Sequence, residues 1–430
     1  MALYNSNFVA TPINKSLEIN GLRWNLDESQ QMHRSPFSKD RDRILYSKSF
    51  LRLRGKTQIF MLHRNDYIRT RLTHSLEVNQ IAKSIASALC QNLDLVEAIA
   101  LGHDVGHTPF GHIGERTLEE LIKNDKDIPA EKRGFKHNLQ ALRLLCDLEK
   151  GADYPEHKGL NLTKYTLWGI AHHSSTGNHP FYNSYLASIS NFWSYEGLIV
   201  AIADEIAQRH HDIEDGLRYG IISRKELIEE IKKFQPLFKR QDKECFRRLD
   251  TEKDTLEEPV FNSLFARLVV NLYTTDVIEY SKMKILQLER RYNITNQEQF
   301  KENKARISEN EYKECISFSP QMQQCDSVFH TFLKERILDS FQTQAMDGKA
   351  EYIIKKLYYA FRDNPLQLPD TSLFSFADII NINTHKRKEI TNNITEANRA
   401  EFHRCIVDYI GGMTDNFAYD EFDRLYGTRV

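Results

Sequence analysis

Residues 101–115 of this 430-residue chain read LGHDVGHTPFGHIGE, and upstream of them His74 closes the segment RTRLTHS. A further carboxylate, Asp204, lies in IVAIADEIAQRHHD. His74, His103, Asp104 and Asp204 thus form an H…HD…D pattern. Two imidazoles and two carboxylates suit Mn²⁺, Fe²⁺, Zn²⁺ and, less readily, Mg²⁺. A lone histidine is more often a structural side chain, but the four residues together predict a metal site.

The adjacent pair His103 and Asp104 constrains the local backbone. Neighbouring side chains on a helix diverge by about 100°, so both can face one ion only at a helix end or kink. Asp94 is the expected N-cap of a helix over 94–104 that would carry the pair at its C-terminal end. The breakers that follow predict a shaped loop over 105–115 instead of a continued helix: Gly106, Pro109, Gly111 and Gly114.

His112 and Glu115 are candidates for proton transfer. They lie three residues apart in the predicted loop, where Glu115 would raise the pKa of the imidazole and fix its tautomer. The alternative is that His112 only braces the loop. Four further histidines could belong to the site or to the scaffold: His107, His137, His172 and His173.

Composition favours an ordinary helix-rich globular protein, with 40% hydrophobic and 27% charged residues and only 18 Gly and 11 Pro. The formal net charge of −2 gives no global reason to expect nucleic acid or a membrane as the main partner. Six cysteines without a CxxC pair favour a reducing compartment. Neither a signal segment nor an apolar run of about 20 residues is visible, so a cytoplasmic protein without membrane contact is expected.

Helical periodicity recurs along the chain, and β-type alternation is scarce. An apolar stripe over 78–89 predicts a helix that begins close after His74, and the last helix is expected over 398–422. Counting from Asp204, a polar helix face suitable for a pocket wall contains Gln208, His211, Asp212 and Asp215. We therefore predict a mainly α-helical protein with an irregular arm over 1–35, a catalytic core over 36–221 and a helical region over 222–430. This last region would complete the pocket and make oligomer contacts.

A run of Arg and Lys residues between Arg41 and Arg71 forms a local basic patch. Such residues grip phosphate oxygens well, although most charge runs are solvated helix faces. Arg71 is the strongest candidate for a phosphate contact, because it precedes His74 by three residues and would face the same site from an adjacent turn.

Several phrases give the chain a specific resemblance: RDRILYSKSFLRLRGKTQIF, RTRLTHS, GHDVGHTPFGHIGE, ADEIAQRHHDIEDGL and DYIGGMTD. Over about 36–220 and again near 395–418 it resembles the HD-domain deoxynucleoside triphosphate triphosphohydrolases, the bacterial dGTPase-like family. The resemblance implies an HD-domain helical core with additional C-terminal helices. It also implies cleavage of a dNTP between the 5′-oxygen and the α-phosphorus, giving a 2′-deoxynucleoside and inorganic triphosphate.

The resemblance also implies residue roles. His74, His103, Asp104 and Asp204 match the metal ligands, and His112 and Glu115 match the catalytic histidine and its carboxylate. The substrate contacts that it implies, together with His107 and Gln208 as further candidates, are Gln58 at the sugar, Arg71 and His137 at phosphates, and Asp212 at the 3′-hydroxyl. Arg54 stands where many relatives have Gln, a difference that bears on base and allosteric specificity. Gln208 stands where some subgroups have Tyr, which favours a subgroup other than the strict dGTPases.

Family likeness further implies dependence on Mn²⁺ or Mg²⁺, a homo-oligomer, commonly a hexamer, and a nucleotide effector at a subunit interface. Two other functions remain open on the residues. One is an HD-type phosphodiesterase or nucleotidase acting on another nucleotide. The other is a nucleotide sensor or single-stranded nucleic-acid-binding protein that uses the Arg41–Arg71 patch.

Overall fold

The computed structural model describes residues 34–58, 69–150 and 158–427. These residues form 20 α-helices joined by short 3₁₀ and π turns, and within them the only β pairing consists of two isolated bridges. The prediction of a mainly α-helical protein is confirmed. The arm predicted over 1–35 lies, up to residue 33, outside the described residues.

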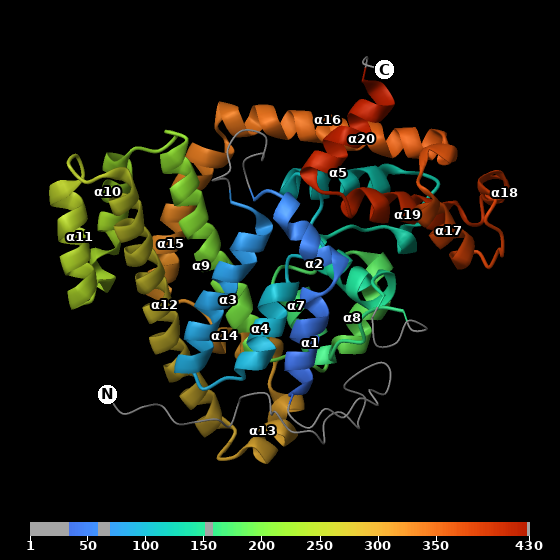
Figure 1. The fold of residues 1–430 in the computed structure, drawn as a ribbon. Coiled ribbons are helices and arrows are strands. Elements are labelled where there is room, and N and C mark those ends of the chain that lie inside the picture. Colours follow the sequence, from blue (N-terminus) through green and yellow to red (C-terminus); the bar gives the residue numbers. More distant parts are fainter. Residues whose placement is uncertain (1–33, 59–68, 151–157, 428–430) are drawn as a thin grey trace.

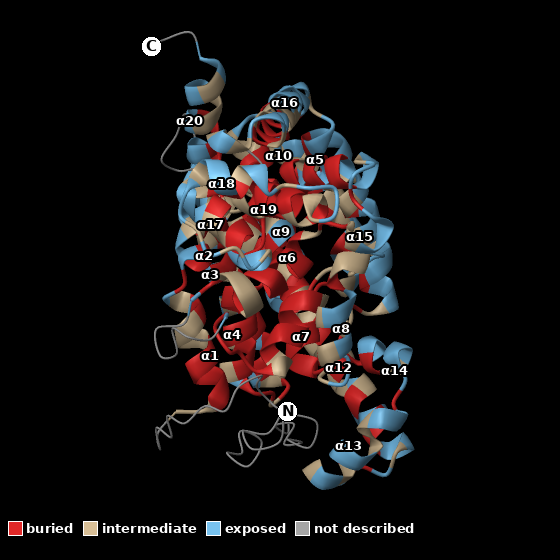
Figure 2. Cartoon of the chain, turned by 90° about the vertical axis from the view of Figure 1, so that its right-hand side faces the viewer, coloured by how far each residue is buried: buried red, intermediate tan, exposed pale blue. Residues whose placement is uncertain are grey.

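The helices before residue 220 surround a central apolar helix, α4, which contacts α1, α3, α7 and α9 (Figure 1). The bounds are α1 Pro36–Leu45, α2 Lys48–Arg52, α3 Arg71–Ala88, α4 Leu93–Gly102, α5 Gly111–Asn124, α6 His137–Arg143, α7 Lys164–His172, α8 Asn183–Ile189 and α9 Tyr195–Arg218. Residues Leu95 to Gly102 of α4 are buried except for Glu97, and Figure 2 shows α4, α6 and α7 deep in the interior. A helix that is apolar nearly all round must be enclosed. Its C-terminal end therefore presents His103 and Asp104 inside the protein.

A second set of helices packs onto the same hydrophobic core from the side of α9. It comprises α10 Arg224–Ile231, α11 Arg240–Glu252, α12 Glu258–Arg291, α13 Gln297–Asn303, α14 Glu309–Cys315 and α15 Pro320–Leu333. Arg209 of α9 binds Asp326 of α15 at 2.9 Å, and Tyr273 of α12 donates to the same carboxylate at 2.8 Å. Residues 222–333 thus support the helix that carries Asp204.

A third set of helices builds a separate apolar cluster together with α5. It comprises α16 Phe341–Asp363, α17 Asp370–Ile379, α18 Arg387–Asn392, α19 Arg399–Gly411 and α20 Asp415–Tyr426. In Figure 1, α16 lies across the top of the molecule against α5, α19 and α20. None of the helices in the described ranges combines the length and apolar character needed to cross a bilayer.

Three expected boundaries differ from the structure. The N-cap of α4 is Asn92, whose side chain accepts from the amides of Asp94 and Leu95, so Asp94 is not the cap. The expected loop over 105–115 ends early, because α5 already begins at Gly111. The expected helix over 398–422 is divided at 412–414, where Thr414 caps α20 after a Gly-Gly pair. Each difference reflects capping or glycine chemistry that periodicity does not report.

The junction between α19 and α20 also fixes the loop before α5. The buried Asp415 carboxylate accepts from the Thr57 amide at 3.1 Å, the Thr57 hydroxyl at 2.6 Å and the Phe110 amide at 2.9 Å. Nζ of Lys56 donates to the Gly411 carbonyl at 3.0 Å and to the His107 carbonyl. The C-terminal helices therefore hold the two segments that border the histidine cluster.

Candidate active site

Three helices bring the predicted metal ligands together. His74 on α3, His103 directly after α4 and Asp204 on α9 offer ligand atoms within 4.8 Å of one another. Nε2 of His74 lies 2.8 Å from Oδ1 of Asp204, and Nε2 of His103 lies 3.8 Å from the same oxygen. Nδ1 of His103 is 2.7 Å from the Ala100 carbonyl, to which it donates, so Nε2 carries the lone pair. That Nε2 is buried without a hydrogen-bond partner, as expected of a ligand for a divalent ion.

Asp104 divides its two carboxylate oxygens between the cluster and Arg71. Oδ1 lies 3.6 Å from Nε2 of His103 and 3.2 Å from Nε2 of His107, while Oδ2 accepts from Nη1 of Arg71 at 3.0 Å. Burial alone would raise the pKa of Asp104, but Arg71 and the two histidines outweigh burial and hold this pKa well below its usual value. Asp104 is therefore a carboxylate that can face an ion with one oxygen.

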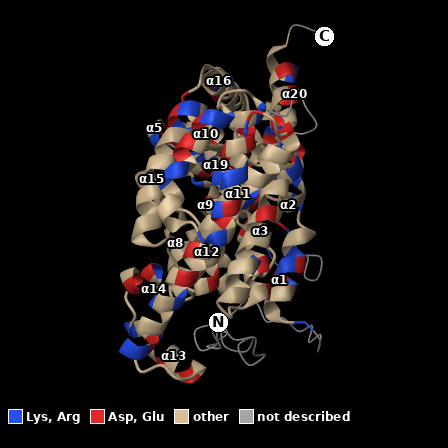
Figure 3. Cartoon of the chain, turned by 90° about the vertical axis from the view of Figure 1, so that its left-hand side faces the viewer, with Lys and Arg blue, Asp and Glu red and all other residues tan. Residues whose placement is uncertain are grey.

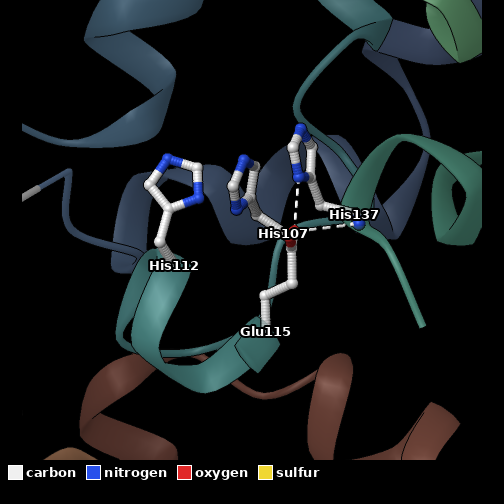
Figure 4. A group of neighbouring side chains, drawn as sticks. All are labelled: His107, His112, Glu115 and His137. Carbon is white, nitrogen blue, oxygen red and sulfur yellow. Dashed lines mark hydrogen bonds and ion pairs between the residues drawn. The ribbon is translucent and has the colours of Figure 1, made fainter. Parts of the chain in front are cut away.

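A second group gathers His107, His112, Glu115 and His137 (Figure 4). The rings of His107 and His137 stack with centroids 3.8 Å apart and an interplanar angle of 16°. Gly106 makes this approach possible, since a Cβ there would lie 2.0 Å from the His137 carbonyl oxygen. The glycine after the HD pair thus allows the start of α6 to pack against the loop.

Glu115 is paired with His137, which corrects the expected pairing with His112. Its carboxylate accepts from the His137 amide at 3.0 Å, from Nδ1 of His137 and from Nζ of Lys136 at 2.7 Å. Burial would raise the pKa of Glu115, but the charge and hydrogen bond of His137 outweigh burial and keep this pKa far below its usual value. Glu115 lies one turn after His112 on α5 and faces α6.

His112 is the member of this group with an exposed side chain. The protein around it still desolvates the ring, and this burial, with the charges of Arg71 and His137, lowers the pKa of His112 to about 4. Glu115 does raise the pKa of His112, as expected, but its effect is smaller than the combined lowering by burial, Arg71 and His137. At neutral pH the imidazole is uncharged, and its exposed edge is open to water or substrate.

The His172–His173 pair separates in the structure. Nε2 of His173 lies 3.1 Å from Nε2 of His137, and Asp104, His137 and His173 offer ligand atoms close enough to hold a cation. Burial, with His103 and His137 nearby, lowers the pKa of His173 to about 3. His172 instead stacks on Trp168 with ring centroids 4.5 Å apart. Sequence left both histidines undecided, and only His173 joins the cluster.

Arg71 has donors to spare. Its side chain is buried, and Nε and Nη2 have no protein partner beyond the bond that Nη1 makes to Asp104. A Cβ at Gly111 would lie 3.0 Å from Nη2 of Arg71 and 3.2 Å from the Gln58 carbonyl oxygen, so these three residues adjoin one another. Unpaired buried guanidinium donors are unusual and suit an anionic ligand.

Other members of the basic run are already paired with carboxylates. Arg41 binds Asp42 and Glu97, and Arg69 binds Glu77 and Glu214. Figure 3 shows acidic and basic residues interspersed over the face that includes α1 and α12. These ion pairs weaken the sequence-based case for an extended phosphate-binding patch between Arg41 and Arg71.

The residues of the predicted polar face of α9 differ in solvent exposure. His211, Asp212 and Asp215 are buried, whereas Gln208 is exposed. Oδ1 of Asp212 has no partner, and burial, opposed by Arg209, raises the pKa of this carboxyl to about 7. Nδ1 of His211 lies 3.1 Å from Nδ1 of His74. His211 was not among the predicted site residues, although its helical spacing from Asp204 already placed it on the same face.

A helical core that buries an H…HD…D set is the arrangement of an HD domain, a metal-dependent hydrolase domain. The HD domain family model matches residues 71–242, and the phosphohydrolase-associated domain model matches residues 316–424. A deoxyguanosinetriphosphate triphosphohydrolase-like protein of Roseobacter denitrificans is 35% identical over 93% of this chain and 94% of its own length. A protein of the same name from Paracoccus denitrificans is 34% identical over 95% of this chain and 97% of its own length. Another, from Geobacter metallireducens, is 34% identical over 96% of this chain and 93% of its own length. The chain belongs to this family, and the resemblance seen in the sequence is confirmed.

Proposed function

We propose that this protein hydrolyses deoxynucleoside triphosphates to a 2′-deoxynucleoside and inorganic triphosphate, with a divalent ion as cofactor, Mn²⁺ or Mg²⁺. The names of its relatives support a nucleotide triphosphohydrolase. One observation on this chain carries the proposal. Buried polar atoms without a protein partner gather around the HD pair and along α9: Nε2 of His103, Nδ1 of His107, Nε and Nη2 of Arg71, and Oδ1 of Asp212. Because unsatisfied buried groups are rare in proteins, an ion and a polyanionic substrate are their natural partners.

His74, His103, Asp104 and Asp204 would hold the ion, which when bound supplies Lewis acidity at the α-phosphate. The spare donors of Arg71 would bind phosphate oxygens next to it, since Arg71 is anchored to Asp104. His107 and His137 line the same side with stacked rings, and Nε2 of His107 faces Asp104 while Nδ1 of His137 faces Glu115. Together these residues offset the negative charge of a triphosphate group.

His112 is the proton-transfer residue in this proposal. It is uncharged in the free protein, because burial, Arg71 and His137 lower its pKa to about 4. A bound triphosphate adds negative charge beside the ring and favours its protonated form. In that form His112 can donate a proton to the leaving 5′-oxygen. Glu115 acts on His137, which it binds directly, and positions that residue.

Asp212 would read the sugar by accepting from the 3′-hydroxyl, with Gln58 as a further contact at the sugar and Gln208 at the exposed side of α9. Leaving a buried carboxylate unpaired costs about 1–3 kcal/mol, so a substrate that supplies the hydroxyl is favoured over one that lacks it. The unpartnered Oδ1 of Asp212 is the observation behind this assignment.

The test is product-resolved turnover of each dNTP with Mn²⁺ or Mg²⁺, singly and in pairs, because an effector nucleotide could be required. Release of inorganic triphosphate is expected from the wild-type protein and not from Asp104→Asn, which keeps the shape of the side chain. Orthophosphate as the product would support a nucleotidase or phosphodiesterase instead. Single-strand binding without any metal-dependent turnover would support the nucleic-acid sensor.

Asp212→Asn is expected to stabilise the fold increasingly as pH rises while weakening catalysis. The folded pKa of about 7 lies above the ordinary value of 3.8, so the folded protein holds a proton that the unfolded chain releases. Stability of the wild type therefore falls as pH rises from about 4 to 7, a loss that Asn avoids. The Tm difference between variant and wild type should be small at pH 4 and largest at pH 8.

The same variant should lower kcat/KM for dNTPs about tenfold, because a charge-assisted hydrogen bond becomes a neutral one. A 2′,3′-dideoxynucleoside triphosphate is the control, because it lacks the 3′-hydroxyl and cannot make this bond. Its kcat/KM should differ much less between the wild type and Asp212→Asn. Equal loss on both substrates would rule out the 3′-hydroxyl contact.

A further inference from the structure

We infer that Glu77 and His211 are positioning residues that set the proton and the orientation of His74, and thereby the metal affinity of the site. This inference rests on the proposed use of His74 as a metal ligand. Neither residue belongs to the H…HD…D pattern. The sequence placed His211 only on a candidate pocket wall and gave Glu77 no role.

The three side chains form one continuous line of contacts between α3 and α9. Oε2 of Glu77 is hydrogen-bonded to Nε2 of His211. Nδ1 of His211 lies 3.1 Å from Nδ1 of His74, with ring centroids 5.0 Å apart and an interplanar angle of 72°. At its far edge His74 presents Nε2 to Oδ1 of Asp204 at 2.8 Å. Both histidines are buried.

Two neutral imidazoles supply two ring protons for the three contacts of this line, so one contact lacks a proton. We place that gap between Nε2 of His74 and Asp204, where a metal ion would be held. The Glu77 carboxylate only accepts, so His211 donates through Nε2–H and is left with a lone pair on Nδ1. His74 then donates through Nδ1–H to that lone pair, and its own Nε2 keeps a lone pair toward the ion. The opposite tautomer of His74 would place a proton between the ring and the ion. A partner on the second nitrogen of a ligating histidine normally performs this task in metal sites.

Helix geometry explains why Glu77 and His211 can support His74. Glu77 follows His74 by about one turn on α3, and His211 follows Asp204 by about two turns on α9, so each helix carries a ligand and a support on one face. The two helices pack against each other. Arg69 binds Glu77 and also Glu214 of α9, which anchors the carboxylate at the outer end of the line.

Glu77, His210 and His211 are also close enough to form an ion site of their own. Two contacts argue against that assignment. The guanidinium of Arg69 already neutralises the Glu77 carboxylate, and a dication beside it would be repelled. The second contact concerns His211, whose other ring nitrogen faces His74. His210 also lies near Glu77, with its Nδ1 3.8 Å from the carboxylate. His210 is therefore a matched control on the same helix.

The experiment measures Mn²⁺ and Co²⁺ affinity by chelator competition on the full-length protein without substrate. His211→Phe, which keeps a ring but no nitrogen, should weaken binding about 10- to 100-fold. His211→Asn should restore most of this affinity, because its Oδ1 takes the place of Nδ1 and accepts from His74. His210→Phe should bind as the wild type does. The visible spectrum of bound Co²⁺ should change in His211→Phe and not in His210→Phe.

The outcomes separate this inference from the proposed function. If the wild type binds neither ion, the metal site itself is wrong. If it binds them and His211→Phe binds equally well, the positioning role is overturned while the metal site stands. Equal weakening by His210→Phe would instead favour a separate ion site at Glu77. Should His211→Phe fail to fold, Glu77→Gln provides the same test, with a smaller loss expected because its amide oxygen still accepts from His211.

Discussion

His103→Ala is expected to remove tight Mn²⁺ binding and to lower kcat/KM about 10³-fold or more. Nε2 of His103 is buried, carries the lone pair and has no protein partner, so the variant loses a donor that nothing nearby replaces. Lewis-acid stabilisation is worth several kcal/mol, and about 1.4 kcal/mol corresponds to a tenfold change in rate. Equilibrium dialysis with Mn²⁺ and steady-state release of triphosphate measure the two effects.

His172→Ala is the matched control for this variant. His172 lies on α7 and has the same arrangement, with Nδ1 2.9 Å from the backbone carbonyl of Trp168, but its ring stacks on that tryptophan outside the cluster. It should keep wild-type Mn²⁺ affinity. Undiminished affinity in a folded His103→Ala protein would remove His103 from the ligand set.

His112→Ala is expected to lower kcat by about 10²- to 10⁴-fold, the usual contribution of a proton-transfer residue, with little change in Mn²⁺ affinity. Its imidazole has an exposed edge and lies apart from His74, His103 and Asp204, so metal binding should persist. Parallel measurements of kcat, KM and Mn²⁺ dissociation test this separation.

Arg116→Ala serves as the control for position on α5. Its side chain is 65% exposed and pairs with Asp347 of α16 at 3.6 Å, so its loss should leave kcat unchanged. If His112→Ala turns over at the wild-type rate, His112 only braces the start of α5, the alternative that the sequence left open. If it loses Mn²⁺ as His103→Ala does, its role lies in metal binding instead.

The helical class and the spacing of the metal-ligand candidates were accessible from the sequence. Helical periodicity depends on local backbone geometry, so the stripe after His74 correctly predicted the buried side of α3. The HD pair followed by glycine correctly predicted a helix end, because adjacent side chains cannot otherwise share a ligand. Arg71 stood out for the same local reason, its distance of one turn from His74.

Contacts between segments far apart in the chain could not be read in this way. Glu115 lies three residues from His112 but binds His137, because α5 directs it toward the N-terminus of α6. Asp415 closes on Thr57 and Phe110 from the far end of the chain, which explains structurally why the DYIGGMTD phrase accompanies the catalytic motifs. No periodicity or local motif encodes such partnerships.

From the sequence alone we could predict a mainly α-helical protein of the HD hydrolase type. The sequence also indicated which histidine and aspartate donors meet near one point. Donor chemistry and helical spacing are properties of short stretches, and they survive without knowledge of the fold. Tertiary structure alone decided which nitrogen of each histidine is free, since that depends on what the other nitrogen contacts. The line of contacts from Glu77 through His211 to His74 exists only because α3 and α9 pack side by side.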